Sequence, residues 1–365
     1  MNQKLASFFF ALTTSLITYT ALAQTTDTYH PVYRQFKDWV VGCTNTGSCT
    51  VQSAKDPFQE TDDLEANKFE MIIEREAGAK GRLKITLLST DEEKQQYTTL
   101  SADGKPVRAD KKYWSKSDIE WQSKDTSYIL ALIDAIKDSK HLQWSENYKK
   151  NAAISLNGLT ASLLFVDEQQ KRLNTPTAFI RRGNQSESSI PAASPIPILK
   201  QPKDKLAPLT QKQTEQLVRS VRKAQVRLLK EEECVPEEES FDAVDRISQT
   251  EALVRIGCWK GAYNYSSLIF RTPISAPEKL KRLALPLPNA FDKKAGKGNI
   301  VDVFTNADFD SKDRTLSMYA KGRGLGDCGE SASWQFDGKQ FNLVSWHYMG
   351  TCAGSLNWIP LWISK

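Results

Sequence analysis

Six cysteines, arranged as three couples of sequence neighbours, constrain the fold of this chain more than any other feature. The couples are Cys43 with Cys49, Cys234 with Cys258, and Cys328 with Cys352, the last two with the same separation of 24 residues. An even number of cysteines at regular spacings in an exported chain indicates a disulfide framework. Six cysteines allow about 15 pairings. We predict that the neighbours pair.

Such disulfides would contribute substantially to stability. In the chain-entropy model, closing a loop of about 24 residues removes roughly 3.4 kcal/mol of unfolded-state entropy, and the small loop at Cys43 about 2 kcal/mol. The net stability of a domain is only about 5–15 kcal/mol. We therefore expect reduction of the disulfides to weaken the fold badly.

The first 23 residues have the pattern of a cleavable export signal. Lys4 supplies the positive charge, residues 5–17 the apolar stretch, and Ala21-Leu22-Ala23 the cleavage site before Gln24. The apolar stretch is shorter than the roughly 20 residues that a membrane-spanning helix needs. We predict a periplasmic or secreted protein that does not span a membrane.

Length and charge limit the organisation and the partners. The mature chain exceeds the roughly 250–300 residues at which single hydrophobic cores stop growing, which favours two domains. The whole chain has 49 basic and 44 acidic side chains and a formal net charge of +5. This mild excess is not the basic surface of a nucleic-acid-binding protein, so no nucleic-acid partner is expected.

A proline-rich and serine-rich stretch divides the chain. Five prolines lie between Pro191 and Pro208, and proline both fixes φ and lacks a backbone donor, which is typical of a semi-extended linker. The predicted division is a signal peptide (1–23), an N-terminal α+β domain (24–183), a linker (184–209), an amphipathic helix (210–231) and a C-terminal antiparallel β domain with two cysteine pairs (232–365).

Hydrophobic periodicity and turn residues predict the elements of the N-terminal part. Strands are expected at 69–74 and 83–88, forming a hairpin around 76–81, with another tight turn at Asp103-Gly104. Apolar residues at helical spacing predict a helix over 128–137, capped by Ser127. A second helix is expected over 159–166.

The C-terminal part is predicted to begin with a helix and continue as β hairpins. Thr210 and Gln213 have the spacing of a capping box. Strands are predicted at 253–258, 265–270, 300–304, 314–319, 334–336, 341–348 and 358–363. The Asp-rich segment 306–313 is expected to be the turn that joins the third of these strands to the fourth. The predicted fold class is α+β and β-dominated: two disulfide-stapled domains of antiparallel hairpins with a few helices.

The two equal cysteine intervals end alike, which suggests an internal repeat. Leu253-Val254 precedes Cys258 and Leu343-Val344 precedes Cys352, with a glycine shortly after each cysteine. A duplicated β unit with one disulfide in each copy would produce this pattern.

Residues for catalysis or metal binding are scarce. The three histidines, His30, His141 and His347, are far apart in the sequence, and neither an H-E-x-x-H nor a C-x-x-C motif occurs. No metal and no cofactor are therefore predicted. Cys328 with His347 has the composition of a thiol nucleophile and base, but an oxidised sulfur cannot attack. Catalysis is left open and non-enzymatic function is favoured.

Candidate ligand-binding residues gather near the C-terminus. Segment 321–329 has four glycines, whose backbone amides can converge on an anion with Arg323 as an added donor. The alternative is a glycine-rich turn that holds the disulfide. Four tryptophans in the last 32 residues form either an aromatic platform or core. The candidates are Arg323, Asp327, Trp334, Trp346 and His347.

Short segments along nearly the whole mature chain together match one known family. They are 36–43 with Cys49, 154–159, 175–178, 258–264, and 321–329 with Trp334, Asp337-Gly338 and 341–343. The chain resembles a bacterial exported family of unknown function, catalogued as domain of unknown function eleven-seventy-six. Its N-terminal part is also similar to invasion-associated locus B proteins. The resemblance implies the envelope of a Gram-negative bacterium, without an assigned reaction or catalytic residues.

Two classes of function are compatible with this sequence. The favoured one is an exported cell-envelope binding or interaction module whose partner is an envelope protein or glycan. The alternative is a periplasmic hydrolase that acts on envelope glycans or peptides, through a carboxylate pair or through Cys328 and His347.

Overall fold

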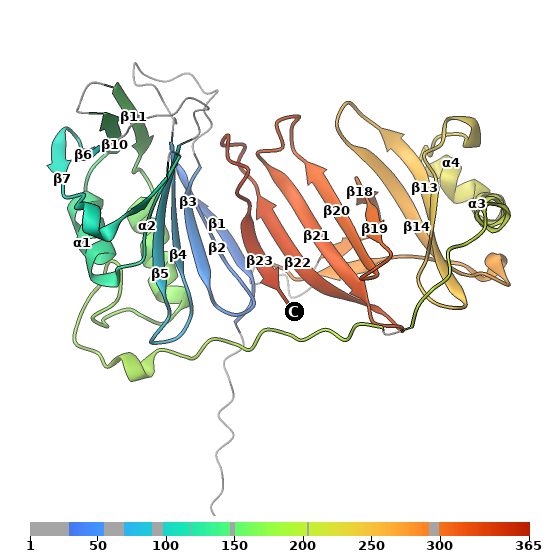
Figure 1. Cartoon of the computed structure of the whole chain (residues 1–365), viewed down its shortest axis with the longest axis horizontal. Coiled ribbons are helices and arrows are strands. Elements are labelled where there is room, and N and C mark those ends of the chain that lie inside the picture. Colours follow the sequence, from blue (N-terminus) through green and yellow to red (C-terminus); the bar gives the residue numbers. More distant parts are fainter. Residues whose placement is uncertain are drawn as a thin grey trace, which may run out of the picture.

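The computed structural model describes residues 29–54, 69–89, 98–117, 119–146, 150–202, 204–291 and 299–365. The predicted export signal lies outside these residues. Within them the chain forms antiparallel sheets with a few helices, arranged as an elongated row (Figure 1). The predicted β-dominated α+β class is confirmed.

The N-terminal part contains two antiparallel sheets. The larger has the order β1-β2-β3-β4-β5-β9-β8, with bounds Val32–Phe36, Trp39–Cys43, Cys49–Ser53, Phe69–Arg75, Leu83–Ser89, Glu120–Ser123 and Ser115–Lys116. The smaller has the order β11-β10-β6-β7, with bounds Lys150–Ser155, His141–Glu146, Thr99–Ala102 and Lys105–Val107. The predicted hairpin is confirmed as β4 and β5, and the turn at Asp103-Gly104 joins β6 to β7.

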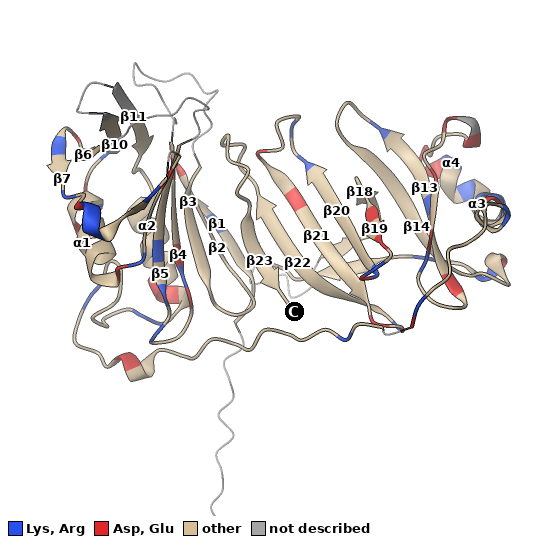
Figure 2. Ribbon diagram, in the orientation of Figure 1, with Lys and Arg blue, Asp and Glu red and all other residues tan. Residues whose placement is uncertain are grey.

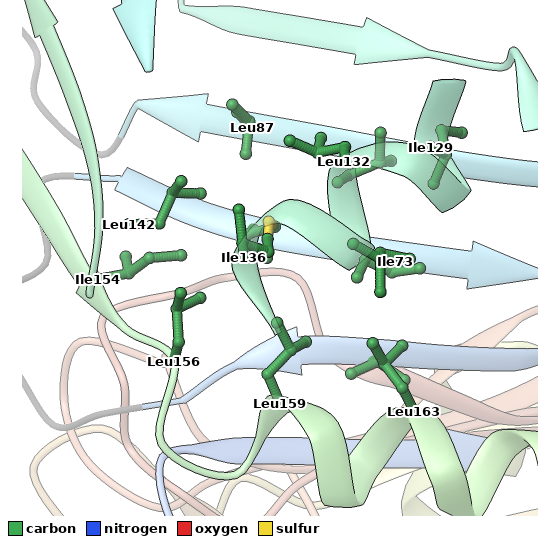
Figure 3. Packing of buried hydrophobic residues seen from close by; sticks show 14 of the residues in the cluster. Ile73, Leu87, Ile129, Leu132, Ile136, Leu142, Ile154, Leu156, Leu159 and Leu163 are labelled. Atoms are coloured by element: carbon green, nitrogen blue, oxygen red, sulfur yellow. The ribbon is translucent and has the colours of Figure 1, made fainter. Parts of the chain in front are cut away.

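Two helices pack on the larger sheet and enclose the first hydrophobic core. Helix α1 (Thr126–Ile136) contacts β5, and helix α2 (Leu159–Gln169) contacts β1, β2 and β3. Figure 3 shows Ile129, Leu132 and Ile136 of α1 close to Ile73 and Leu87 of the strands. The apolar residues of α1 recur at helical spacing and so lie on one face of the helix. This face is buried, as predicted.

The predicted cap of α1 is wrong. Asp125, not Ser127, is the N-cap, and its carboxylate accepts a hydrogen bond from the Tyr128 amide (2.8 Å). An N-cap residue has an extended backbone and directly precedes the first helical residue. Asp125 meets that condition, whereas Ser127 already lies inside the helix.

The segment from residue 184 to residue 209 contains one 3₁₀ turn, η2 (Glu187–Ser189), and no strand or α-helix among its described residues. It runs along the lower edge of the molecule in Figure 1, between the N-terminal part and α3. Its backbone pairs with the last residue of the chain: Leu199 donates to the Lys365 carbonyl (2.5 Å), and Lys365 donates to Pro197 (2.8 Å). Helix α3 (Gln211–Ala224) follows with the predicted capping box, and α4 is Val226–Glu231.

Two larger sheets and one small sheet form the C-terminal part. The first has β12 (Ala243–Arg246), β13 (Glu251–Lys260), β14 (Tyr265–Pro273) and β15 (Lys281–Arg282) in order, with β18 (Phe304–Thr305) on β14. The small sheet pairs β16 (Leu285–Leu287) with β17 (Asn299–Val301). The last has β19 (Asp308–Asp310), β20 (Thr315–Lys321), β21 (Gly329–Phe336), β22 (Phe341–Met349) and β23 (Ile359–Ile363). Short 3₁₀ turns are η1 (Lys111–Tyr113), η3 (Glu237–Glu239) and η4 (Pro277–Lys279).

The predicted connection through the Asp-rich segment is wrong. The segment expected as one strand at 300–304 contributes to β17 and β18, which pair with β16 and β14 rather than with β20. The partner of β20 is β19, which lies inside the segment expected to be a turn. Phe309 is buried between exposed Asp308 and Asp310, which is the alternation of a strand.

The predicted neighbour pairing of the cysteines is confirmed. Disulfides join Cys43 to Cys49, Cys234 to Cys258, and Cys328 to Cys352, so no free cysteine is left. Each of the two equal intervals holds a pair of antiparallel strands: β12 with most of β13 in one, and β21 with β22 in the other. The first interval also holds η3. The duplicated β unit stays a prediction.

A second core joins the two parts of the chain. Tyr33, Val40 and Ala54 belong to the same buried cluster as Trp346 and Ile359 of the last sheet. Side chains alternate between the two faces of a strand, so Val40 faces away from the first core while its neighbours face into it. All five residues of β2 are buried as a result. A third core lies between α3, α4 and the strands β13 and β14.

Candidate functional site

Two of the predicted ligand-binding residues belong to the second core. Trp334 is 1% exposed and Trp346 is fully buried, and the Trp346 indole donates a hydrogen bond to Glu330 (2.8 Å). Trp358 and Trp362 are half-buried, with their indole N–H groups bonded to Gly326 (3.2 Å) and Leu343 (3.1 Å). Buried indoles cannot stack on a ligand. The aromatic platform expected from Trp334 and Trp346 is therefore corrected to core.

Arg323 and Asp327 close the glycine-rich loop onto itself. The Arg323 guanidinium donates to the Asp327 carboxylate (Nε to Oδ1, 2.8 Å) and to the Cys352 carbonyl (3.2 Å). The same carboxylate accepts from the Gly354 amide (2.7 Å). Burial opposes ionisation of Asp327, but the hydrogen bonds from Arg323 and Gly354 outweigh it and lower its pKa. Arg323 thus holds the loop to the segment after β22.

The disulfide between Cys328 and Cys352 leaves no free thiol in this region. Within the described residues, Asp327, Cys328 and Cys352 form one group of potential metal ligands, with ligand atoms within 4.8 Å of one another. The two sulfurs are bonded to each other, so they offer neither thiolate ligands nor a nucleophile. His347 is half-buried, and burial lowers its pKa. The Cys328 and His347 pair is therefore not a catalytic dyad.

Another histidine lines a hollow in the N-terminal part. A cavity of about 500 Å³ lies between the end of α1 and the start of α2, and His141, Ser139 and Ser155 are among its lining residues. The imidazole Nδ1 of His141 is 3.8 Å from the Asp103 carboxylate, which is too long for a hydrogen bond. Asp103 instead accepts from the Lys140 and His141 backbone amides (2.9 Å each). This arrangement fixes a turn rather than orienting a base.

The glycine-rich loop lies against the turn between β13 and β14. The Asn264 side chain donates to the Lys321 carbonyl (2.8 Å) and accepts from the Lys321 amide (3.2 Å). Asn306 donates to the Asn264 side-chain oxygen (2.8 Å) and to the Tyr319 carbonyl (2.8 Å). The two loops lie at the upper ends of their strands in Figure 1. Cys352 and Gly354 join the segment 350–358 to the same place.

Exposed apolar side chains occur on these loops and on the adjoining ends of β13 and β20. We call the following set the aromatic loop surface: Trp259 (57% exposed), Tyr263 (43%), Tyr319 (37%) and Leu325 (60%). Large exposed apolar side chains that cluster on adjoining loops are typical of interaction sites.

Each ring of the aromatic loop surface is held on one side. A Cβ atom on Gly261 would lie 2.5 Å from the Trp259 indole, so the indole rests where only glycine leaves room. The Tyr263 ring lies beside Gly324, where an added Cβ atom would be 3.5 Å from the ring, in ordinary van der Waals contact. Tyr319 stacks on Trp358 with ring centroids 4.6 Å apart and donates to the Gly326 carbonyl (3.3 Å). These rings are therefore oriented before any ligand arrives.

Sequence reasoning missed these aromatic residues. The pairing of β13 with β14 shifts by one residue between Gly257 and Trp259. A bulge of this kind re-aims the side chains that follow it, so alternation along the strand does not predict that Trp259 is exposed. One signal in the sequence could have located these aromatic residues. Two of the segments that resemble the family, 258–264 and 321–329, contact each other in the fold.

Comparisons with known proteins agree with the resemblance seen in the sequence. The chain is 30% identical over 370 residues to an uncharacterized protein, YpfG, of Escherichia coli (strain K12), and the alignment covers 98% of each chain. No solved structure matches. The similarity to invasion-associated locus B proteins is not among these matches and stays a prediction. A family model described as "Protein of unknown function (DUF1176)" matches residues 33–365. The chain belongs to this family, DUF1176.

Proposed function

We propose that this protein is an exported binding module of the cell envelope that holds its ligand on the aromatic loop surface. The observation that carries the proposal is the set of three exposed rings, Trp259, Tyr263 and Tyr319, each held on one side by the fold. Side chains that are ordered in the free protein lose little conformational freedom on binding, which favours affinity.

Three disulfides support the exported location, because disulfides persist in oxidising compartments. In the part of the chain that the structure describes, no helix is long and apolar enough to cross a membrane. The proposed location is the periplasm or the exterior of a Gram-negative cell, and the proposed partner is an envelope protein or glycan. We also retain the proposed division into domains at 24–183 and 232–365.

The hydrolase alternative gains no supporting observation from the described residues. Carboxyl groups whose pKa is raised by burial, Glu70, Asp167, Asp245 and Glu330, lie on four different elements. Glu70 is bonded to Gln52, and Asp245 to Arg255. A native thiol titration should give no free thiol, in agreement with complete cysteine pairing.

The test compares the wild type with a double variant, Trp259→Ala with Tyr263→Ala. Each protein is immobilised and incubated with an envelope extract, and the retained material is analysed for protein and for sugar. The wild type should retain a component that the double variant loses. Val226→Ala, which trims a 69% exposed side chain on α4, is the matched control and should behave as the wild type. Equal retention by the double variant, with its fold verified by circular dichroism, would contradict the proposal.

A further inference from the structure

An apolar cavity lies beside helix α1 in the N-terminal part of the chain. We propose that this cavity binds a fatty acid, an anionic amphiphile with a single acyl chain. The aromatic loop surface belongs to the C-terminal part (Figure 1), so the two sites are separate and this inference does not depend on the function proposed above.

The lining of the cavity suits an acyl chain. The cavity has a volume of about 280 Å³ and lies between α1 and the segment around η1. Ala131 and Ala135, one turn apart on α1, are exposed, and their small side chains leave the space open. Six of the nine lining residues are apolar or aromatic: Val107, Tyr113, Tyr128, Ala131, Leu132 and Ala135. Ligand pockets are lined in this way, with a few polar groups that fix the orientation of the ligand.

Two tyrosines form a wall of the cavity that is ordered without a ligand. The rings of Tyr113 and Tyr128 stack with their centroids 4.5 Å apart. The Tyr128 hydroxyl accepts a hydrogen bond from the Trp114 indole (2.8 Å) and donates one to the Arg108 carbonyl (2.7 Å). Because these rings are already fixed, little binding free energy is lost to ordering them.

The size of the cavity favours a ligand with one chain. An apolar cavity of about 150 Å³ is large enough to bind benzene. The cavity beside α1 has nearly twice that volume, which suits an acyl chain of about ten carbons. The two long chains of a phospholipid would not fit, so the proposed ligand is a free fatty acid rather than a membrane lipid.

Basic residues at one end of the cavity suit an acidic head group. Segment 105–116 contains five basic residues and one acidic residue, and Figure 2 shows basic residues on β7 and beside α1. The Lys112 ammonium lies 4.7 Å from the centre of the Tyr113 ring, which lines the cavity. Lys111 and Lys112 are exposed, and in the described part of the chain neither forms an ion pair. Burial and the charge of Lys111 lower the pKa of Lys116, so a third ammonium group lies near the other two.

The acidic residues of the cavity and of the segment before it have partners of their own. Asp110 accepts a hydrogen bond from Arg108 (2.7 Å). Asp125 lines the cavity, but its carboxylate caps α1 at the Tyr128 amide (2.8 Å). The Glu120 carboxylate accepts from Gln122 (3.0 Å).

The acidic residues of α1 and of the turn after it are likewise engaged or directed elsewhere. Asp134 is bonded to Lys137 (2.9 Å) and to Arg182. Asp138 lines the other cavity, between α1 and α2. The unpaired cations of segment 105–116 are therefore the charged groups available to the carboxylate of a ligand.

The binding experiment uses defined probes with the full-length mature protein. Isothermal titration calorimetry measures the affinities of hexanoate, octanoate and decanoate. Affinity should rise by on the order of tenfold for each added pair of methylene groups, because each group leaves water for the cavity. 1-Octanol and octyltrimethylammonium are the matched neutral and cationic amphiphiles. Both should bind at least about tenfold more weakly than octanoate, and high salt should weaken the binding of octanoate.

One variant tests the position of the acyl chain. Ala131→Leu combined with Ala135→Leu fills the cavity with two larger side chains at exposed helical positions, and leucine is a good helix former. This variant should keep the helical content of the wild type, measured by circular dichroism, and should bind decanoate at least about tenfold more weakly. Ala161→Leu, at an exposed alanine of α2, is the matched control and should bind decanoate as the wild type does.

A second variant tests the head group. Lys111→Gln combined with Lys112→Gln should weaken octanoate by about tenfold, reduce its salt dependence and leave the affinity for 1-octanol unchanged. A purely structural role of these lysines would change the affinity for both probes alike. Lys140→Gln, at an exposed lysine outside this cavity, should leave all affinities unchanged.

Three outcomes would overturn the inference. The first is that none of the three fatty acids binds, or that the cavity-filling variant binds decanoate as tightly as the wild type. The second is equal binding of octanoate and 1-octanol, which would remove the acidic head group from the proposal. The third is that the protein sediments with phosphatidylglycerol vesicles but binds no fatty acid, because the basic segment would then contact a membrane surface.

Discussion

Gly329 shows how one residue shapes the aromatic loop surface. It begins β21 with φ of +140°, a backbone conformation that side chains disfavour. A Cβ atom at this position would lie 2.0 Å from the Ala320 carbonyl oxygen and 3.0 Å from the Trp358 indole. Glycine is therefore required both by the backbone and by the indole that supports Tyr319.

We expect Gly329→Ala to lower the free energy of unfolding by more than the roughly 1–3 kcal/mol of backbone strain alone. The matched variant is Gly338→Ala, where φ is +99° but no atom lies within 4 Å of the added Cβ. Urea unfolding of both variants measures the difference. Equal losses of stability would show that the contact with Ala320 does not matter.

Glu70 is a buried carboxyl group where the two parts of the chain meet. It is 4% exposed and accepts hydrogen bonds from Gln52 and from Asn357 (3.1 Å). Burial raises its pKa above 4.5, although hydrogen bonds from Ser355, Asn357 and Gln52 oppose the shift. The neutral form is therefore favoured in the folded protein more than in the unfolded chain.

This raised pKa predicts a pH-dependent contribution to stability. The contribution of Glu70 is fully present below its unfolded pKa and is lost as pH rises through the folded pKa. The stability of the wild type relative to Glu70→Gln should therefore fall as the pH rises above the ordinary pKa of 4.5. Urea unfolding at a series of pH values from below to above this value provides the measurement. A constant difference between the two proteins would contradict the prediction.

At the scale of elements, the local sequence of helix α1 specifies its buried face but not its N-cap. The spacing of Ile129, Leu132, Ile133 and Ile136 predicts the helix and its buried face, and both are observed. The sequence prediction chose Ser127 as the cap, but Asp125 and Thr126 also carry oxygens suited to that role. The backbone dihedral angles at the start of the helix decide which residue is the cap. These angles depend on the course of the chain between β9 and α1.

We expect Asp125→Ala to lower the free energy of unfolding by about 1 kcal/mol through loss of the cap. Ser127→Ala, two residues later and exposed, should change it by less than about 0.5 kcal/mol. Thermal unfolding of the two variants measures both values. If Ser127→Ala were the more damaging change, the assigned cap would be incorrect.

Among the strands, pairings between sequence neighbours can be predicted from local sequence, whereas pairings between distant segments cannot. The hairpins β4–β5 and β21–β22 follow from alternation and from turn residues such as Asp337-Gly338. The pairing of β18 with β14 joins residues about 40 positions apart and has no local signal. The aspartate neighbours of Phe309 suggest a turn, yet the segment is a strand in which the Phe309 side chain is buried.

For the whole molecule, the second core decides how the two parts relate. Tyr33 and Val40 pack with the last sheet, and the Asn45 side chain exchanges hydrogen bonds with Ile363 (2.9 and 3.1 Å). Gly42 permits close approach, because a Cβ atom there would lie 2.3 Å from Ile359. The proposed domains are thus joined by shared apolar burial as well as by the linker.

We expect residues 24–183, produced alone, to expose the face of β2 that carries Val40. The apolar side chains that lose their partners each contribute about 1.5–3 kcal/mol when buried. The fragment should therefore have a lower thermal midpoint than the whole protein and should bind the hydrophobic dye ANS. Val40→Ser should reduce dye binding by the fragment. A fragment that binds no dye would show that this face is covered in another way.

The sequence by itself determined the features that depend on neighbours along the chain: the disulfide partners, the helices, most hairpins and the place of the glycine-rich loop. Only the tertiary structure decided which aromatic residues are exposed and which are buried. Trp346 is buried in the core that it shares with Tyr33 and Val40 of the N-terminal sheet. Trp259 is exposed, and it directly follows the bulge between Gly257 and Trp259. Likewise Arg323 is paired because Asp327 folds back on it. Exposure and pairing depend on residues distant in sequence, so the local pattern does not contain them.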